Sequence, residues 1–176
     1  MRKVAIIPTG NEIACGIVVD SDSPAILDRI LEHFPACEFT RMPPCVDRLD
    51  TIIAAIMRCV HQAYSHIILI GGSGEGHCHQ PEMSRDETHA AMIKVLDYYE
   101  KCDVFGPNGH RWCRIVAGRC GGALLFNVPG PYVEAVAAIE AALAILTGGN
   151  VSFRDLADAC ATAVCKHYPQ ASFCDE

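Results

Sequence analysis

The chain has 176 residues, of which 51% are hydrophobic, so it is long and apolar enough for one folded domain with a sizeable core. This composition excludes a largely disordered protein. The formal net charge of −7 and the absence of any basic run exclude a general nucleic-acid binder.

The hydrophobic pattern gives no sign of a membrane segment or of a secretion signal. The longest apolar stretch, residues 132–146, contains Glu134 and Glu140 at helical spacing. The apolar run at the N-terminus is too short for a signal peptide. We therefore expect a cytoplasmic protein whose 11 cysteines are reduced. No Cys-x-x-Cys pair occurs among them, which excludes a zinc ribbon or a thioredoxin-type motif.

The first half of the chain predicts alternating strands and helices. Ser23 is expected to cap a helix whose first position is Pro24, because serine is a favoured N-cap and proline a favoured first residue. Apolar residues at helical spacing support this helix and the next one. The predicted elements are a strand at 3–8, a helix from 24 to about 34, a strand at 36–41, a helix from about 47 to 64 and a strand at 66–70.

The second half predicts a helix, a hairpin and two further helices. Ser84 is expected to cap the first of these helices, and Ser152 with Asp155 forms a capping box for the last. The predicted elements are a helix over 86–100, a loop over 103–111, strands at 112–117 and 123–128 joined by a turn at 118–122, a helix from 132 to about 146 and a final helix from about 153.

The order of these elements predicts the fold class. Alternation of strands and helices implies an α/β protein, a three-layer α/β/α sandwich with a mostly parallel sheet, right-handed crossovers and a C-terminal hairpin strand. We expect residues 1–148 to form this domain. Residues 149–176 are expected to form a helical tail whose apolar side packs on the domain or on a neighbouring subunit.

The strand predicted at 66–70 runs directly into a glycine-rich turn, which is the strongest sign of a ligand site. Main-chain amides in such a turn approach a ligand closely and can bind an anion such as a phosphate. The alternative is a mobile loop without a ligand. An ATP-binding loop and a dinucleotide fingerprint are disfavoured, because His77 and Cys78 stand where a lysine, a hydroxyl residue or a glycine is needed. The candidate residues of the turn are Gly71, Gly72, Ser73, Gly74, Glu75 and Gly76.

Four motifs follow one another along the chain: Pro8-Thr9-Gly10-Asn11-Glu12-Ile13, Asp20-Ser21-Asp22-Ser23, Gly71-Gly72-Ser73-Gly74 and Asn127-Val128-Pro129-Gly130-Pro131. In this order they resemble motifs of the molybdopterin-binding domain family of molybdenum cofactor biosynthesis. The resemblance covers about residues 4–146. The family includes molybdopterin adenylyltransferases, molybdopterin molybdotransferases and the related domain of competence-damage-inducible proteins.

The resemblance implies a three-layer α/β fold that binds molybdopterin, free or adenylylated. The amides of residues 72–76 and the Ser73 hydroxyl would then hold the phosphate of the ligand. Asp20 and Asp22 would accept hydrogen bonds from pterin or ribose donors, and their alternative role is helix capping. Pro129 and Gly130 would border the ligand or only form a turn between a strand and a helix. The implied ligand-binding residues outside the turn are Thr9, Gly10, Asp20, Ser21, Asp22, Pro129 and Gly130.

The sequence departs from the family where catalysis is concerned. Members of the family often carry a carboxylate after the second strand, where this chain has 43–45 as Pro-Pro-Cys, unless Asp47 takes its place. Asp86 is the candidate catalytic residue and Mg²⁺ ligand, in a stretch similar to the family's Arg-Asp-x-Thr that arrives several residues late. Its alternative role is a charge in the first turn of a helix.

Three hypotheses about function therefore stand side by side. The first is a Mg²⁺-dependent transferase similar to molybdopterin adenylyltransferases or molybdotransferases, with Asp86 as its catalytic residue. The second is a non-catalytic molybdopterin-binding module, which the missing carboxylate favours. The third is a nucleotide-binding protein or hydrolase similar to the competence-damage-inducible relatives.

Other residues suggest further contacts. His77, Cys78 and His79 are candidate ligands of a transition metal, and the alternative is a polar lid over the pocket. Arg111 and Arg114 would contact an anion or a pterin ring, or only decorate the hairpin. Relatives of this domain assemble as trimers or dimers, so the resemblance also implies a homo-oligomer.

Overall fold

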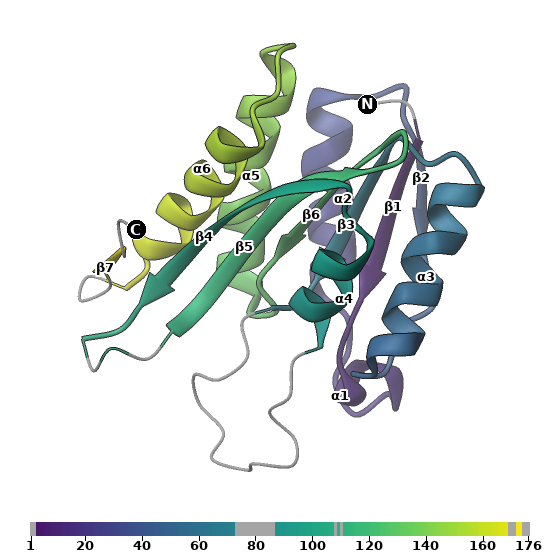
Figure 1. Ribbon diagram of the computed structural model, residues 1–176, viewed down its shortest axis with the longest axis horizontal. Helices are drawn as coiled ribbons and strands as arrows, with labels where there is room; N and C mark the ends of the chain where they lie inside the picture. Colours follow the sequence, from purple (N-terminus) through teal and green to yellow (C-terminus); the bar gives the residue numbers. More distant parts are fainter. Residues whose placement is uncertain (1–2, 73–86, 108, 110, 169–171, 174–176) are drawn as a thin grey trace.

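A computed structural model describes residues 3–72, 87–107, 109, 111–168 and 172–173 of the chain. Its centre is a sheet of seven described strands in the order β2-β1-β3-β6-β5-β4-β7 (Figure 1). The strands are β1 Lys3–Pro8, β2 Glu38–Arg41, β3 His66–Ile70, β4 Tyr98–Phe105, β5 Arg111–Cys120, β6 Ala123–Val128 and β7 Ser172–Phe173.

Most of the sheet runs in one direction. Strands β2, β1, β3 and β6 run parallel to one another. Strand β5 is antiparallel to β6 and β4 is antiparallel to β5, so β4 again runs with the parallel set. Five of the seven described strands therefore share one direction, which confirms the expected mostly parallel sheet with a hairpin near its C-terminal end.

Helices cover both faces of the sheet, as expected for a three-layer sandwich (Figure 1). Helices α2, α5 and α6 contribute to one core with β1, β5 and β6, and helices α3 and α4 contribute to a second core on the opposite face. No helix among the described residues is long and apolar enough to cross a membrane. The helices are α1 Asn11–Ala14, α2 Asp22–His33, α3 Leu49–His61, α4 Thr88–Val95, α5 Tyr132–Thr147 and α6 Phe153–Cys165.

The helix predicted over 86–100 is wrong in its second half. Helix α4 ends at Val95, Leu96 takes an extended conformation, and β4 begins at Tyr98. The apolar spacing of this stretch fits a helix, but pairing with β5 along the whole of β4 stabilises the strand. The same pairing extends β4 to Phe105, so the first residues of the loop expected over 103–111 are strand instead. Strand β5 also continues beyond its expected end at 117, to Cys120.

The start of α2 also differs from the prediction. The helix begins at Asp22, and its N-cap position, Ser21, makes no capping hydrogen bond through its side chain. Asp20 instead accepts hydrogen bonds from the main-chain N (2.9 Å) and the Oγ (2.6 Å) of Ser23. The expected cap of α6 is confirmed, because the Ser152 side chain accepts from the Asp155 main-chain N at 3.2 Å. The cap expected at Ser84 lies outside the described residues.

Candidate functional site

Three of the predicted motifs meet where the parallel strands end. From the carboxyl end of β1 the chain leads to β2 on one side, and from that of the adjacent β3 it leads to β4 on the other side, so the two connections leave in opposite directions. Ligands of open α/β sheets bind at such a point. The main-chain N of Thr9 donates to the Ile70 oxygen at 2.9 Å, and that of Gly71 donates to the Val128 oxygen at 2.9 Å. These bonds bring the predicted residues Thr9, Gly10, Gly71, Gly72, Pro129 and Gly130 to one edge of the sheet.

Gly71 and Gly72 can only be glycine in this arrangement. Their φ angles are +152° and +92°, where side chains are strongly disfavoured. A Cβ on Gly71 would lie 2.1 Å from Thr9 Oγ1, and a Cβ on Gly72 would lie 2.3 Å from His89 Nε2. The first two residues of the predicted turn are therefore enclosed by the side chain of Thr9, which follows β1, and by side chains of α4 and β6.

A buried amide holds the start of the turn against the hairpin. Asn127 is fully buried in β6. Its Nδ2 donates to the main-chain oxygens of Gly71 and Arg114, each at 2.9 Å, and its Oδ1 accepts from the Val116 main-chain N at 2.7 Å. These three bonds fix the turn relative to β5 and β6.

Two residues at the start of α4 complete this polar cluster. The Oγ1 of Thr88 lies 2.8 Å from that of Thr9, and the Nε2 of His89 lies 2.8 Å from the Arg114 main-chain oxygen. A carbonyl oxygen can only accept, so the hydrogen is assigned to Nε2 of His89. Sequence reasoning did not name His89, and it named Thr88 and Asn127 only as members of motifs, without a role for their side chains. A usable signal existed for Asn127, because it is the polar residue within the otherwise apolar strand 123–128.

The main-chain N–H of Gly72 is a donor without an acceptor among the described residues. Gly72 is buried, and its carbonyl oxygen accepts from the Arg114 main-chain N at 3.4 Å, but its own N–H forms no hydrogen bond with them. Buried main-chain donors are nearly always paired. The position therefore suits an acceptor supplied from outside this part of the chain, such as an oxygen of an anion.

Asp20 and Asp22 lie beside the end of β2. Besides the two bonds from Ser23, the Oδ2 of Asp20 accepts from the Arg41 Nε at 2.6 Å. Burial alone would raise the pKa of Asp20, but these donors outweigh it and hold its pKa below the usual range. Burial and the neighbouring Asp20 raise the pKa of Asp22. Asp20 thus has the capping role considered in the sequence, and a ligand-binding role for 20–22 stays a prediction.

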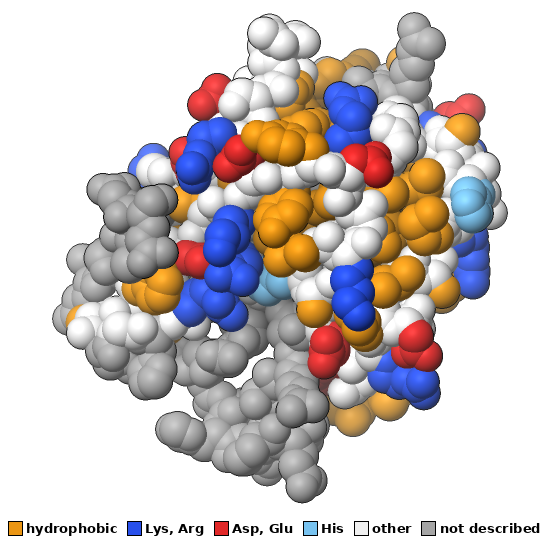
Figure 2. Space-filling view, viewed as in Figure 1, with side chains coloured by type: hydrophobic (Ala, Val, Ile, Leu, Met, Phe, Trp, Pro, Cys, Tyr) orange, Lys and Arg blue, Asp and Glu red, His pale blue; other side chains and the backbone are white. Residues whose placement is uncertain are grey.

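The two arginines of the hairpin, Arg111 and Arg114, differ in their ion pairing and in their exposure. Arg114 forms a two-pronged ion pair with Asp103, with Nε 2.6 Å and Nη2 2.7 Å from its oxygens. Arg111 lies 4.0 Å from the same carboxylate and is more exposed. Figure 2 shows a group of Lys and Arg side chains over β4 and β5, next to a histidine. Arg111 is thus the more exposed and less tightly paired of the two, and its contact with an anion stays a prediction.

Several predicted site residues lie outside the described residues. They are Ser73, Gly74, Glu75, Gly76, His77, Cys78, His79 and Asp86. Within the part of the chain that the structure describes, no group of three or more His, Cys, Asp or Glu side chains is placed to hold a metal ion. A Mg²⁺ at Asp86 and a transition metal at 77–79 therefore stay predictions.

The segment that lacks the family's carboxylate lies next to the first motif. The main-chain N of Gly10 donates to the Cys45 oxygen at 3.0 Å. The main-chain N of Asp47 donates to the Asn11 Oδ1 at 3.1 Å, so Asp47 is held beside α1. The main chain of Asp47 thus lies beside the first motif, and its role as the substitute for the missing carboxylate stays a prediction.

Comparison with known proteins connects this architecture to solved structures. No family model and no curated protein matches the chain. It is similar to the molybdopterin biosynthesis enzyme MoaB from Thermus thermophilus (TM-score 0.58, 22% identity, 86% of this chain and 100% of that chain). It is also similar to a molybdopterin biosynthesis protein from Mycobacterium abscessus (TM-score 0.62, 18% identity, 92% of this chain and 94% of that chain). A third similar structure is the protein CinA with unknown function from Thermoplasma acidophilum (TM-score 0.53, 18% identity, 73% of this chain and 88% of that chain). At these identities the comparison establishes the fold, and this chain has the three-layer fold of molybdopterin biosynthesis proteins.

Proposed function

We propose that this protein acts in molybdenum cofactor biosynthesis and binds the phosphate of molybdopterin, free or adenylylated, at the turn that follows β3. The observation that carries this proposal is the buried N–H of Gly72, which has no acceptor among the described residues. It lies at the carboxyl end of β3, where the connections that leave β1 and β3 diverge, which is where this class of sheet binds ligands.

The surroundings of Gly72 support an anion. Main-chain donors bind phosphate without a lysine, which this turn lacks. The Thr9, His89 and Asn127 side chains are already bonded to main-chain oxygens of Ile70, Arg114 and Gly71, so they hold the strand ends around the start of the turn.

Titration of the purified protein with molybdopterin, followed by pterin fluorescence, tests this proposal. The matched control is the same pterin after enzymatic removal of its phosphate. Binding that is lost with the phosphate supports the proposal. Equal binding of both compounds contradicts the role of the turn, and absence of binding to either contradicts the proposed function.

We further propose that binding is the main activity and that catalysis is lost or reduced. The Pro-Pro-Cys sequence at 43–45 lacks the carboxylate that the resemblance leads one to expect. An assay with molybdopterin, ATP and Mg²⁺ separates the possibilities, with Asp86→Ala as the test variant and the exposed Asp28→Ala as the control. Binding without turnover supports a module. Turnover that Asp86→Ala abolishes and Asp28→Ala retains supports a Mg²⁺-dependent transferase instead.

A nucleotide-binding protein or hydrolase is the second candidate, because the sequence motifs also resemble those of the competence-damage-inducible relatives. Its test uses ATP and ADP-ribose in the same titration. Binding of these nucleotides without binding of molybdopterin supports the second candidate. The homo-oligomer implied by the resemblance stays a prediction, which sedimentation velocity of the purified chain checks.

A further inference from the structure

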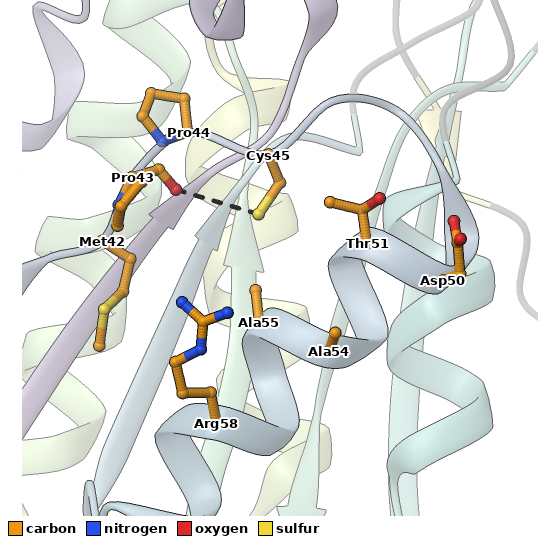
Figure 3. Close-up of a pocket in the computed structure, with 9 residues that line it drawn as sticks. All are labelled: Met42, Pro43, Pro44, Cys45, Asp50, Thr51, Ala54, Ala55 and Arg58. Atoms are coloured by element: carbon orange, nitrogen blue, oxygen red, sulfur yellow. Dashed lines mark hydrogen bonds between the residues drawn. The ribbon is translucent and has the colours of Figure 1, made fainter.

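A cavity of about 430 Å³ lies between α3 and the segment that connects β2 to α3. Figure 3 shows the guanidinium of Arg58 extending from α3 toward this segment, with the Cys45 sulfur facing the helix. No residue of the predicted phosphate site lines the cavity. The cavity is therefore a separate feature of the molecule, although the Cys45 main chain is bonded to Gly10.

The walls of the cavity are mainly apolar. Met42, Pro43 and Pro44 form one side, and Ala54 and Ala55 form the other. Because both alanines are short, the surface of the helix is hollowed between Thr51 and Arg58. An apolar body of the size of one aromatic ring fits a cavity of this volume.

One end of the cavity carries an uncompensated positive charge. Arg58 is exposed and forms no ion pair with any residue that the structure describes. The carboxylate that also borders the cavity, Asp50, is held by Arg48, whose Nε and Nη2 lie 3.2 and 2.8 Å from its oxygens. Because Asp50 is paired with Arg48, it does not form an ion pair with Arg58.

The floor of the cavity does not repel an anion. The Cys45 thiol is buried and lies 3.9 Å from the Pro43 oxygen, to which it donates. Burial raises the pKa of Cys45, so its thiol stays neutral at physiological pH. The cavity thus combines a neutral floor, apolar walls and one free guanidinium.

We propose that this cavity is a second ligand site, which binds a small organic carboxylate with an apolar body. The carboxylate pairs with the fork of the Arg58 guanidinium, whose planar geometry matches it, and the apolar body lies between the prolines and the two alanines. This proposal goes beyond the function proposed for the glycine-rich turn and does not depend on it.

Nuclear magnetic resonance tests the site with benzoate as the probe and benzamide, its neutral analogue of similar shape, as the control. We expect benzoate to cause saturable shifts of the amide signals of Thr51, Ala54 and Ala55, and benzamide to bind more weakly. Arg58→Gln, which keeps most of the side chain without the charge, should weaken benzoate binding by up to about fivefold, as an exposed ion pair allows.

Two further variants sharpen the experiment. Ala55→Leu fills the cavity with a good helix former and should abolish the shifts. Arg154→Gln removes an exposed arginine of α6, on the other face of the sheet, and should leave binding unchanged. The proposal is overturned by absence of saturable shifts in the native protein, by equal binding of benzamide, or by benzoate binding that Arg58→Gln leaves intact.

Discussion

The side-chain amide of Asn127 donates to the main-chain oxygen of Gly71 at 2.9 Å, and so joins β6 to the start of the ligand turn. The register of β5 with β6 ends at the pair Ala117 and Phe126. Beyond that pair the Asn127 side chain replaces the main-chain ladder, because it accepts from the Val116 N. Further along β5, the main-chain N of Arg114 donates to the Gly72 oxygen at 3.4 Å, so Gly72 lies next to β5 at this edge of the sheet.

Replacement of Asn127 by Asp should therefore destabilise the protein strongly. Aspartate keeps the size and the acceptor but loses both hydrogens that bond to Gly71 and Arg114, and it buries a charge. We expect a loss of about 3 kcal/mol in the free energy of unfolding, measured by urea denaturation at pH 7. The exposed Asn150→Asp is the control and should change stability little. Equal effects at both positions would contradict the bridging role of Asn127.

Gly72→Ala should weaken both stability and phosphate binding. The new Cβ takes an unfavourable φ of +92° and would meet the His89 Nε2 at 2.3 Å. We expect about 2–4 kcal/mol of destabilisation from urea denaturation, together with loss of molybdopterin binding. Gly149→Ala is the matched control, because its φ is +85° but nothing lies within 4 Å of the added Cβ. It should cost only about 1 kcal/mol, and a loss as large as that at Gly72 would mean that the contact with His89 does not matter.

Asp20→Asn should reveal a stabilising contribution that depends on pH. Although burial opposes it, the donors from Ser23 and Arg41 lower the pKa of Asp20 in the folded state below its unfolded value near 3.8. The native carboxylate thus stabilises the fold above about pH 4, and this stabilisation is lost as the pH falls through the lowered folded pKa. We expect the variant to lose about 1–2 kcal/mol at pH 7 and progressively less below pH 4, measured by denaturation at several pH values. A deficit that stays constant down to pH 2 would rule out the charge as its cause.

His66 should make the protein less stable in mild acid. Burial lowers the pKa of His66 to about 4 in the folded state, from 6.5 as its ordinary value. Between these two pH values the unfolded chain binds a proton that the native protein does not, so stability falls as the pH drops from 6.5 toward 4. The loss attributable to this residue should be on the order of 2 kcal/mol.

The variant His66→Gln tests the origin of this dependence. It removes the titrating ring, so the curve of unfolding free energy against pH should become flatter between pH 7 and pH 4. His61→Gln, at an exposed position on α3, serves as the control and should leave the curve unchanged. If both variants keep the slope of the native protein, another group is responsible for it.

Much of the fold was predictable because its signals are local. The strand over 66–70 is a continuous apolar run, and the helix that ends at Thr147 shows apolar residues at helical spacing, so both elements were expected close to their observed bounds. The cap at Ser152 was expected for the same reason, since a capping box needs residues only three positions apart. The glycine-rich turn after a buried strand pointed to one edge of the sheet, which is where the structure places Gly71 and Gly72.

The remaining features depend on partners that lie far away along the chain. Tyr98–Phe105 is a strand because it pairs with Arg111–Cys120, and its own apolar pattern fits a helix. Asp20 forms an ion pair with Arg41, and Asn127 donates a hydrogen bond to Gly71; no local sequence pattern predicts either contact. The sequence by itself thus determined the order of the elements and the place of the turn, because periodicity and turn chemistry act over a few residues. Only the tertiary structure decided which polar groups meet there, because burial forces each of them to find a partner from another strand or helix.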